Sequence, residues 1–324
     1  MNIPFELQEA TDKLLEGRSI LNIRNCVSSI CGRYDSESGQ GRVLVKNSEE
    51  AVSYAIARMP GTYGAVRSAL EAYAESTDFM PETLTDIGSG TGAAVWAAAS
   101  VYDFKKVTCF ERERSMADIG KYMLSYGTPA MKNAAWILGD VTANGDASSC
   151  TNNGDIVTAS YIMNELRPGD RKGFLDLLWN LSNNAIILVE PGTKEGFGNI
   201  RMAAEYYKSL GGTVIAPCTH MNACPLPDDD WCHFSCRIQR SRTQKYVKGG
   251  DAPYEDEKFS YLAVMKTANA GDEGYSRIIR HPIINKGYIE LKTCSGNGIE
   301  NIKVTSRDKE RFKAAKKAKW GDRI

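Results

Sequence analysis

Apolar residues in the first quarter of the chain recur at helical spacing. Within residues 5–15, 51–59 and 63–74 they return every three or four positions, which is typical of helices with one buried face. A polar stretch at 34–40 interrupts this pattern and predicts a loop. We therefore expect residues 1–80 to form a helical cap that covers an edge or a face of a sheet.

From residue 83 onward, short apolar runs rich in β-branched residues alternate with helical stretches. Strands are expected at 83–89, 105–111, 134–140, 155–160 and 185–192, and helices at 93–101, 115–126 and 171–181. Strands that alternate with helices of this length predict a doubly wound α/β fold with a parallel sheet.

The pattern becomes less regular after another expected helix at 195–210. A sixth strand is expected from residue 213 and a late strand at 258–266, with a long insertion at about 218–257 between them. Long stretches of this kind inside compact domains are usually functional or disordered. We therefore expect an α/β domain over residues 81–268 that contains this insertion.

The last part of the chain predicts a separate C-terminal extension, residues 269–324. Strands are expected there at 287–293 and 299–305, followed by a helix from 307 to about 319.

Charge and composition limit the classes of function. The chain contains 40 Lys and Arg and 40 Asp and Glu, so its overall charge predicts no polyanion binding and any nucleic-acid surface must be local. The first residues lack the apolar run of a secretory signal, and no apolar run is long enough to span a bilayer. Nine cysteines, an odd number, indicate reduced thiols and metal ligation in such a chain. These features favour a cytoplasmic protein.

A glycine-rich turn, DIGSGTG at residues 86–92, ends the first expected strand and opens a helix. Gly88, Gly90 and Gly92 permit a tight turn and a close approach of the backbone to a ligand. The GxGxG spacing differs from the usual GxGxxG of dinucleotide-binding proteins and resembles that of class I methyltransferases. The turn therefore predicts a site for S-adenosylmethionine, with another nucleotide or a vestigial, empty site as the alternatives.

Three carboxylates stand where such a ligand needs polar partners. Glu111 ends the second strand, about 20 residues after the turn, where a carboxylate can accept both ribose hydroxyls. Asp140 ends the third strand beside the expected adenine edge. Asp86 precedes the turn, where it can orient the ligand's amino group through water.

The side of the site that faces the methyl acceptor carries fewer signals. Residues 160–166 follow the fourth strand, and they lack the Asp/Asn-Pro-Pro-Tyr motif of amino-methylating enzymes. Asn164 and Glu165 are the catalytic candidates, and they either contact a substrate or cap the following helix. Cytosine-C5 methylation needs a cysteine nucleophile, and the Pro-Cys and Thr-Cys dipeptides at Cys218 and Cys294 superficially resemble the ones it uses. Both cysteines are better explained as metal ligands.

Four cysteines in the C-terminal half form the second candidate site. Cys218, Cys224 and Cys232 lie within the insertion, and Cys294 lies in the extension. Thiolates bind zinc or iron–sulfur clusters. Structural zinc sites usually contain cysteine pairs two to four residues apart, and the longer gaps here leave room for a larger object. The alternatives are zinc, with a histidine as a further ligand, and buried thiols without a metal.

The remaining thiols and the histidines complete this picture. The candidate histidines are His220 and His233. Cys236 is ambiguous. The others are interpreted as ordinary core or surface thiols: Cys26, Cys31, Cys109 and Cys150.

Several motifs are shared with one known family. They are RMPGTYGAV, DIGSGTG, SYIMNEL, LVEPGTKEGF, APCTH, CPL, DWCHFSCRIQRS, EDEKFSYL and the terminal WGD. On these motifs, roughly residues 50–324 resemble the mitochondrial small-ribosomal-subunit methyltransferase-like proteins and their bacterial relatives (the Rsm-twenty-two or methyltransferase-like-seventeen type).

This resemblance implies a class I methyltransferase fold that acts on small-subunit ribosomal RNA or on the assembly of that subunit. It also implies a [4Fe–4S] cluster on Cys218, Cys224, Cys232 and Cys294, with zinc as the alternative metal. Such a cluster would hold the C-terminal extension against the core.

Two basic segments favour an RNA partner. One lies in the insertion and carries Arg237, Arg240, Arg242, Lys245 and Lys248 without an acidic residue. The other is the C-terminal helix, with Lys309, Arg311, Lys313, Lys316, Lys317 and Lys319. Such segments contact phosphates, and a solvated helix face is the alternative for the second one.

The sequence therefore predicts a monomeric class I methyltransferase-fold protein of the small ribosomal subunit, without a membrane partner. Its chemistry would be in-line transfer of a methyl group from the sulfonium to an RNA atom, helped mainly by positioning and desolvation. One alternative is a non-catalytic assembly factor that binds RNA. Another is a small-molecule methyltransferase with a structural zinc and no RNA affinity.

Overall fold

The computed structural model describes residues 1–141, 152–267 and 274–324. The expected domain boundary at residue 268 and the thiol of Cys150 lie outside these residues. Within them, no helix is long and apolar enough to cross a membrane.

Four helices form the N-terminal part, as the spacing of apolar residues predicted. They are α1 (Phe5–Leu15), α2 (Ile20–Glu37), α3 (Ser48–Ala57) and α4 (Met59–Ala74). The loop expected at 34–40 is wrong in its first half, because α2 continues through Glu37. The ring of Tyr34 packs against that of Tyr54, with centroids 6.2 Å apart, so a contact between helices outweighs the polar composition of this stretch.

A mixed sheet forms the centre of the molecule, with strands in the order β3-β2-β1-β4-β5-β8-β6. The strands are β1 (Thr83–Ile87), β2 (Lys106–Glu111), β3 (Ala135–Leu138), β4 (Gly154–Ser160), β5 (Ser182–Pro191), β6 (Thr213–Ala216) and β8 (Tyr254–Met265). The strands from β3 to β5 are parallel, whereas β8 runs antiparallel to both β5 and β6. The expectation of a parallel sheet is therefore wrong at β8. This arrangement is the Rossmann-like class I methyltransferase fold.

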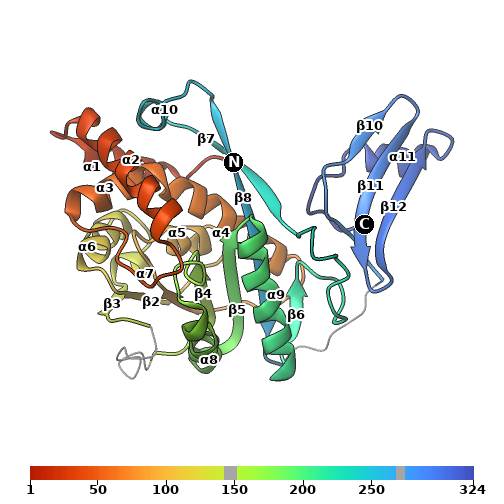
Figure 1. The fold of residues 1–324 in the computed structure, drawn as a ribbon, viewed down its shortest axis with the longest axis horizontal. Helices are drawn as coiled ribbons and strands as arrows, with labels where there is room; N and C mark the ends of the chain where they lie inside the picture. Colours follow the sequence, from red (N-terminus) through yellow and green to blue (C-terminus); the bar gives the residue numbers. More distant parts are fainter. Residues whose placement is uncertain (142–151, 268–273) are drawn as a thin grey trace.

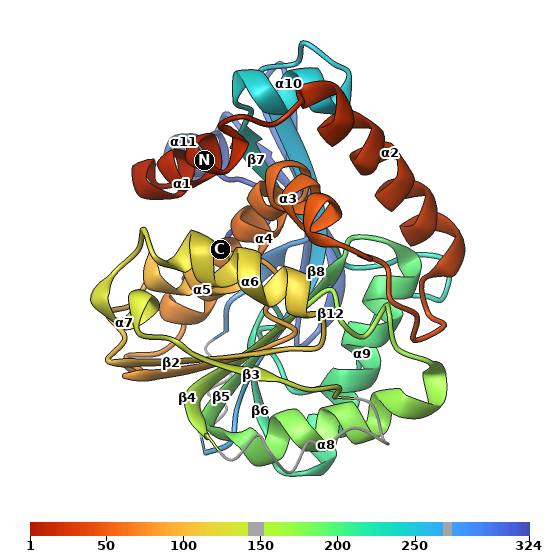
Figure 2. The same ribbon diagram turned by 90° about the vertical axis from the view of Figure 1, so that its left-hand side faces the viewer.

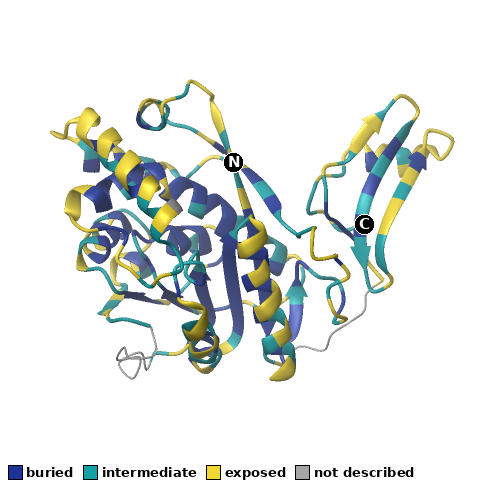
Figure 3. Ribbon diagram, in the orientation of Figure 1, coloured by how far each residue is buried: buried dark blue, intermediate teal, exposed yellow. Residues whose placement is uncertain are grey.

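Helices cover both faces of this sheet (Figure 2). On one face, α3 and α4 lie beside α5 (Ala93–Ala99) and α6 (Arg114–Leu124), followed by the short α7 (Pro129–Lys132). The other face packs against α8 (Arg171–Leu181) and α9 (Lys194–Ser209). The central strands are buried on both sides, while the outer faces of the helices are exposed (Figure 3).

The insertion is more regular than a long loop. It contains β7 (Phe234–Gln239), which pairs with β8 in antiparallel fashion, and α10 (Arg242–Lys248). Ser241 and Gln244 form a capping box at the start of α10. The side chain of Gln244 also donates to the carbonyl oxygen of Ile56 at 3.3 Å, which fastens this part of the insertion to the N-terminal helices.

The C-terminal extension builds a second, antiparallel sheet that stands apart from the first (Figure 1). It contains β9 (Arg277–Ile278), β10 (Ile283–Asn285), β11 (Tyr288–Ser295) and β12 (Gly298–Thr305), with α11 (Lys309–Ala315) packed on one face. The expected helix to about 319 is too long. Past α11 the chain returns to pair with β9, since the backbone N–H of Ile278 donates to the carbonyl oxygen of Asp322.

Candidate functional site

The glycine-rich turn after β1 adopts backbone conformations that favour glycine. Gly88, Gly90 and Gly92 have φ values of 68°, 53° and 85°, in the left-handed region that other residues rarely occupy. The N–H of Gly88 donates to the carbonyl oxygen of Phe110 at 2.8 Å, which fixes the turn against the end of β2. A Cβ atom at Gly88 would lie 2.2 Å from Cδ1 of Ile162. The turn therefore passes directly beside the loop that follows β4.

Glu111 ends β2 and holds the turn in place. Its Oε2 accepts from the backbone N–H of Gly90 at 2.7 Å, and its Oε1 accepts from that of Glu113 at 2.8 Å. Burial raises the pKa of Glu111. Because a carboxylate offers about four acceptor positions, Glu111 keeps acceptor capacity after these two bonds.

Asp86 lies beneath the turn. It is 1% exposed, and its Oδ1 accepts from the hydroxyl of Thr158 at 2.6 Å. Its Oδ2 is buried without a hydrogen-bond partner among the residues that the structure describes. Burial raises the pKa of Asp86 to about 7. An unsatisfied buried carboxyl oxygen at this place is consistent with a polar group of a ligand or a water nearby.

One cavity brings several of the predicted residues together at the carboxyl ends of β1 to β4. It contains about 790 Å³ of empty space, its open mouth included. Its lining includes Gly88, Gly90, Glu111, Asp140 and Glu165. Parts of the chain more than 70 residues apart thus meet at the edge of the sheet where doubly wound folds bind their ligands.

Asn164 and Glu165 do not cap a helix. The next helical turn, Pro168–Asp170, begins after Arg167 without a side-chain cap, and α8 has none either. Glu165 lines the cavity, shares a hydrogen bond with Tyr34, and has its pKa raised to about 7 by burial. The Oδ1 atom of Asn164 is buried and unpaired within the described part of the chain. The capping alternative is therefore wrong for both residues.

Three tyrosines that sequence reasoning missed also line this cavity: Tyr34, Tyr54 and Tyr161. Tyr161 has a φ of 64°, a conformation that is strained for a bulky residue and is found mostly at functional sites. Its hydroxyl donates to Oε1 of Glu257 at 3.0 Å. The tyrosines come from α2, from α3 and from the loop after β4, so no local motif joins them.

Glu190 supports the loop that carries Asn164 and Glu165. It is 2% exposed, accepts from the backbone N–H of Met163 at 3.0 Å and from Nδ2 of Asn199 at 3.4 Å. Burial raises its pKa to about 8. The available signal was a carboxylate at the end of an otherwise apolar strand.

The second candidate site is an apolar cavity lined by Cys218, Cys224, Cys232 and Cys294. Cys218 follows β6, the next two belong to the segment before β7, and Cys294 lies on β11. Cys236 lies elsewhere, on β7, where its Sγ faces α4 close to Gly64. The fold thus gathers the same four thiols that the sequence singled out.

Burial, with a smaller effect of neighbouring thiols, raises the pKa of Cys218, Cys232 and Cys294 and keeps them protonated when no metal is bound. Burial raises the pKa of Cys218 to about 11 and that of Cys294 to about 12, and the neighbouring thiols add to both shifts. Three cations lower these pKa values: Lys208 and Arg277 act on Cys218, and Arg280 acts on Cys232. Arg277 is 3% exposed, and its Nη2 atom is buried without a described partner. A buried cation beside buried thiols suits a site that carries negative charge when occupied.

The four thiols do not form a closed metal-binding site in this arrangement. Among the described residues, no group of three or more His, Cys, Asp or Glu side chains is arranged to hold one. The Nε2 atom of His220 lies 3.7 Å from Sγ of Cys294. Zinc–sulfur and zinc–nitrogen bonds are about 2.3 Å and about 2.0–2.1 Å long, so two ligand atoms of one tetrahedral zinc lie about 3.6 Å apart. The distance between these two atoms therefore fits zinc, and the zinc alternative stays open.

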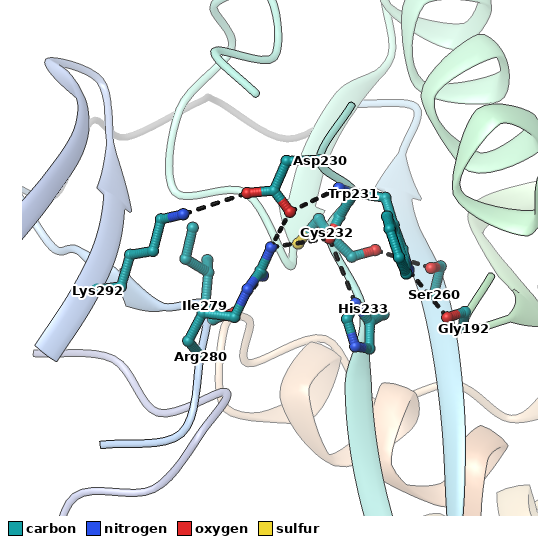
Figure 4. A network of polar contacts seen from close by, with 9 residues as sticks. All are labelled: Gly192, Asp230, Trp231, Cys232, His233, Ser260, Ile279, Arg280 and Lys292. Atoms are coloured by element: carbon teal, nitrogen blue, oxygen red, sulfur yellow. Dashed lines mark hydrogen bonds and ion pairs between the residues drawn. The ribbon is translucent and has the colours of Figure 1, made fainter. Parts of the chain in front are cut away.

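A polar network joins this site to the C-terminal extension (Figure 4). The carboxylate of Asp230 forms ion pairs with Arg280 and with Lys292, the latter at 3.2 Å. On the other side, the indole N–H of Trp231 donates to the carbonyl oxygen of Gly192 at 3.0 Å. The cysteine-bearing segment is therefore bonded both to the central domain and to the extension.

The basic segment of the insertion is largely neutralised within the molecule. Arg237 donates two bonds of 2.7 Å to Asp256, and both Arg240 and Lys248 form ion pairs with Glu255. Within the described residues, Arg242 and Lys245 form no ion pair. RNA contact through all five cations stays a prediction, but three of them already have carboxylate partners.

Known proteins resemble this chain along most of its length. The human mitochondrial ribosome assembly protein METTL17 is 26% identical over 285 residues, which cover 83% of this chain and 61% of that protein. The chain thus spans about six-tenths of its relative's length.

Two solved structures align at low identity, an O-methyltransferase family protein from Burkholderia thailandensis and magnesium protoporphyrin IX methyltransferase from Synechocystis PCC 6803 with bound S-adenosylmethionine. The first has 9% identity and a TM-score of 0.47 over 77% of this chain and 72% of its own. The second has 12% identity and a TM-score of 0.42 over 73% and 91%.

A family model provides the decisive comparison. The model described as mitochondrial small ribosomal subunit Rsm22 matches residues 48–324. This range includes the glycine turn, the loop after β4 and all four cysteines of the second site. The chain therefore belongs to the Rsm22 family.

Proposed function

We propose that this chain binds S-adenosylmethionine beside the glycine turn and acts on the small ribosomal subunit, through its RNA, during assembly. The observation that carries the proposal is the convergence of Gly88, Gly90, Glu111 and Asp140 on one cavity at the carboxyl ends of parallel strands. Family membership supplies the ribosomal context. We include a monomeric state and a cytoplasmic location in the proposal, on the sequence arguments given above.

The residues around the cavity fit this methyl donor. Left-handed glycines let the backbone of the turn approach a ligand, and Glu111 has acceptor positions left for the ribose hydroxyls. Asp140 lines the same cavity and would meet the adenine edge, and Asp86 lies behind the turn. When bound, S-adenosylmethionine supplies an electrophilic methyl group.

Glu165 is the best candidate for a general base. Its pKa, raised by burial to about 7, allows it to take the proton that an acceptor N–H or O–H releases on methylation. Tyr34 orients its carboxylate through their shared hydrogen bond. Asn164 offers a buried, unpaired carbonyl oxygen to a substrate donor.

We also propose that Cys218, Cys224, Cys232 and Cys294 hold a [4Fe–4S] cluster. The support is an apolar cavity lined by four thiols, with the cations Arg277 and Arg280 nearby. A bound cluster would supply a covalent tie between the insertion and the extension. Zinc is the alternative metal.

A non-catalytic assembly factor is the second candidate function. The human relative is named as a ribosome assembly protein. Donor binding with RNA binding, but without methyl transfer to small-subunit RNA, is the outcome that this candidate predicts.

Donor binding is tested by substituting the glycine turn. Gly90→Val places a β-branched side chain at a φ of 53°, with its Cβ 3.3 Å from Met116. We expect the affinity for S-adenosylmethionine, measured by isothermal titration, to fall at least tenfold. Gly17→Val is the matched control, because Gly17 also has a positive φ, of 74°, but faces open space. Unchanged affinity in Gly90→Val, with the fold intact, would remove the donor-site assignment.

The proposed cluster is tested by substituting, one at a time, two cysteines four residues apart, Cys232 and Cys236. After anaerobic purification, we expect wild type and Cys236→Ser to contain iron and sulfide and to show the broad visible absorption of a cluster. Cys232→Ser should lose both and unfold at lower denaturant concentration, because metal binding is coupled to folding. Stoichiometric zinc without iron in the wild type would replace the cluster with the alternative metal.

A further inference from the structure

Charge is distributed unevenly between the C-terminal sheet and the rest of the molecule. Residues 276–324, which we call the C-terminal module, contain 13 Lys and Arg but only 5 Asp and Glu. Residues 1–275 contain 27 and 35. The overall balance therefore conceals a module with eight excess positive charges on a body with eight excess negative ones.

Most of this positive charge is exposed and unpaired. Nine basic side chains of the module are exposed: Lys286, Lys303, Arg307, Lys309, Arg311, Lys313, Lys316, Lys317 and Lys319. None of the nine forms an ion pair with any residue in the described part of the chain. By contrast, Arg237, Arg240 and Lys248 in the insertion are all paired with carboxylates.

The fold directs these cations outward. Phe312 and Ala315 of α11 pack on the buried face of the sheet, against residues such as Leu291. Positions 309, 313 and 316, at i, i+4 and i+7, lie along one side of the helix next to this packed face, and all three side chains are exposed. Figures 1 and 3 show this module standing away from the central domain, with much of its surface exposed.

The face of the same sheet that α11 does not cover adds side chains on which RNA bases can stack. Nζ of Lys303 lies 3.9 Å from the centroid of the Tyr288 ring, which is partly exposed on β11. On the edge strand β10, Ile283 is in register with Glu290 of this face and is 57% exposed. Single-stranded RNA is held by basic surfaces together with aromatic and apolar side chains on which bases stack.

We infer that the C-terminal module is the RNA-binding surface of this protein, and that the basic segment of the insertion is not. This inference rests on the proposed function, since the RNA is that of the small ribosomal subunit. The charge and exposure of the module favour RNA over an acidic protein, because stacking groups accompany the cations. Phosphates contact the exposed lysines along α11, and unpaired bases contact the face of the sheet that carries Tyr288.

Two matched double variants test the inference. Lys313→Gln with Lys316→Gln removes two cations from the module, and Arg242→Gln with Lys245→Gln removes the two unpaired cations from the insertion. Binding of each full-length protein to small-subunit ribosomal RNA is measured across a salt series. We expect the module variant to lose about tenfold or more in affinity and about two units of salt slope, because each phosphate contact contributes about one unit. The insertion variant should bind as the wild type does.

The possible outcomes distinguish a failure of the proposed ribosomal function from a failure of the proposed RNA-binding surface. If the wild type does not bind this RNA at any salt concentration, the proposed ribosomal function fails. If the wild type binds and the module variant matches it in affinity and slope, or if the insertion variant loses as much, the assignment of the surface fails. Both variants change exposed or partly exposed side chains, and an unchanged affinity for S-adenosylmethionine verifies that each is folded.

Discussion

Burial sets the protonation of the carboxyl groups that support the cavity. Asp86 and Glu190 are 1% and 2% exposed, and their pKa values are raised to about 7 and about 8. In the folded state, each group holds a proton that the unfolded chain releases near the ordinary pKa of about 4. The folded state then binds more protons than the unfolded one, so each group lowers stability as the pH rises through this interval.

Glu190→Gln isolates this effect at one residue. The variant cannot ionise, and its amide oxygen can still accept from the N–H of Met163. Relative to the variant, the wild type should lose stability as the pH rises from about 4.5 to about 8, and the difference should level off above that range. Urea unfolding at a series of pH values measures this difference in the free energy of unfolding. Parallel stability curves for the two proteins would show that Glu190 has no raised pKa.

Residue-level prediction identified the cavity-lining residues that follow a local motif and missed those that reach the cavity from distant parts of the chain. The glycine turn, Glu111 and Asp140 were found because they follow strands in a fixed order. Tyr34 and Tyr54 reach the same cavity from the N-terminal helices, and nothing in their local sequence indicates this. Tyr161 carried no signal either, because its left-handed backbone is imposed by the tertiary structure.

At the level of elements, the regular α/β part was predictable and the insertion was not. The strands β1, β2, β4 and β5 are apolar runs, since both of their faces are covered by helices, whereas the edge strand β3 is partly exposed. The direction of β8 does not follow from periodicity, because apolar spacing is the same in parallel and antiparallel strands. Signals for β7 and α10 were present, as the alternating residues of Phe234–Gln239 and the capping box at Ser241. They were interpreted for their cysteines and charges instead.

The contact between α4 and β7 gives a test at this scale. A Cβ at Gly64 would lie 2.7 Å from Cδ1 of Ile238 and 2.9 Å from Sγ of Cys236. Gly64→Ala should therefore destabilise the protein, because overpacking costs on the order of 1–3 kcal/mol and the gain in helix propensity is about 1 kcal/mol.

The matched control is Gly198→Ala in α9, where a new Cβ meets no atom within 4 Å. This variant should be more stable than the wild type by about 0.5–1 kcal/mol. Thermal or denaturant unfolding compares the two. Equal shifts in both variants would mean that α4 and β7 do not pack closely.

At the scale of the whole molecule, the cysteine-bearing segment lies between the central domain and the basic C-terminal module. Asp230 bonds it to Arg280 and Lys292 of the C-terminal module, and Trp231 bonds it to the central domain. Arg277 adds a bond from its Nε atom to the carbonyl oxygen of Pro217, at 2.8 Å. The state of the four thiols is therefore mechanically linked to the placement of the basic module.

The separation of charge makes the molecule an electric dipole. The positive pole is the C-terminal module, beside the β8 and β6 end of the main sheet, and the donor cavity lies toward β1 to β3 (Figure 1). A polyanion attracts the positive module and repels the acidic body, so the molecule turns its module toward the polyanion. This orienting effect is strongest at low ionic strength, where charges are least screened. The first encounter with RNA is then made at the end remote from the cavity. Under the proposed function, a nucleotide presented to the cavity would then come from another part of the RNA than the part held by the module, and one RNA would contact the protein at two separate places.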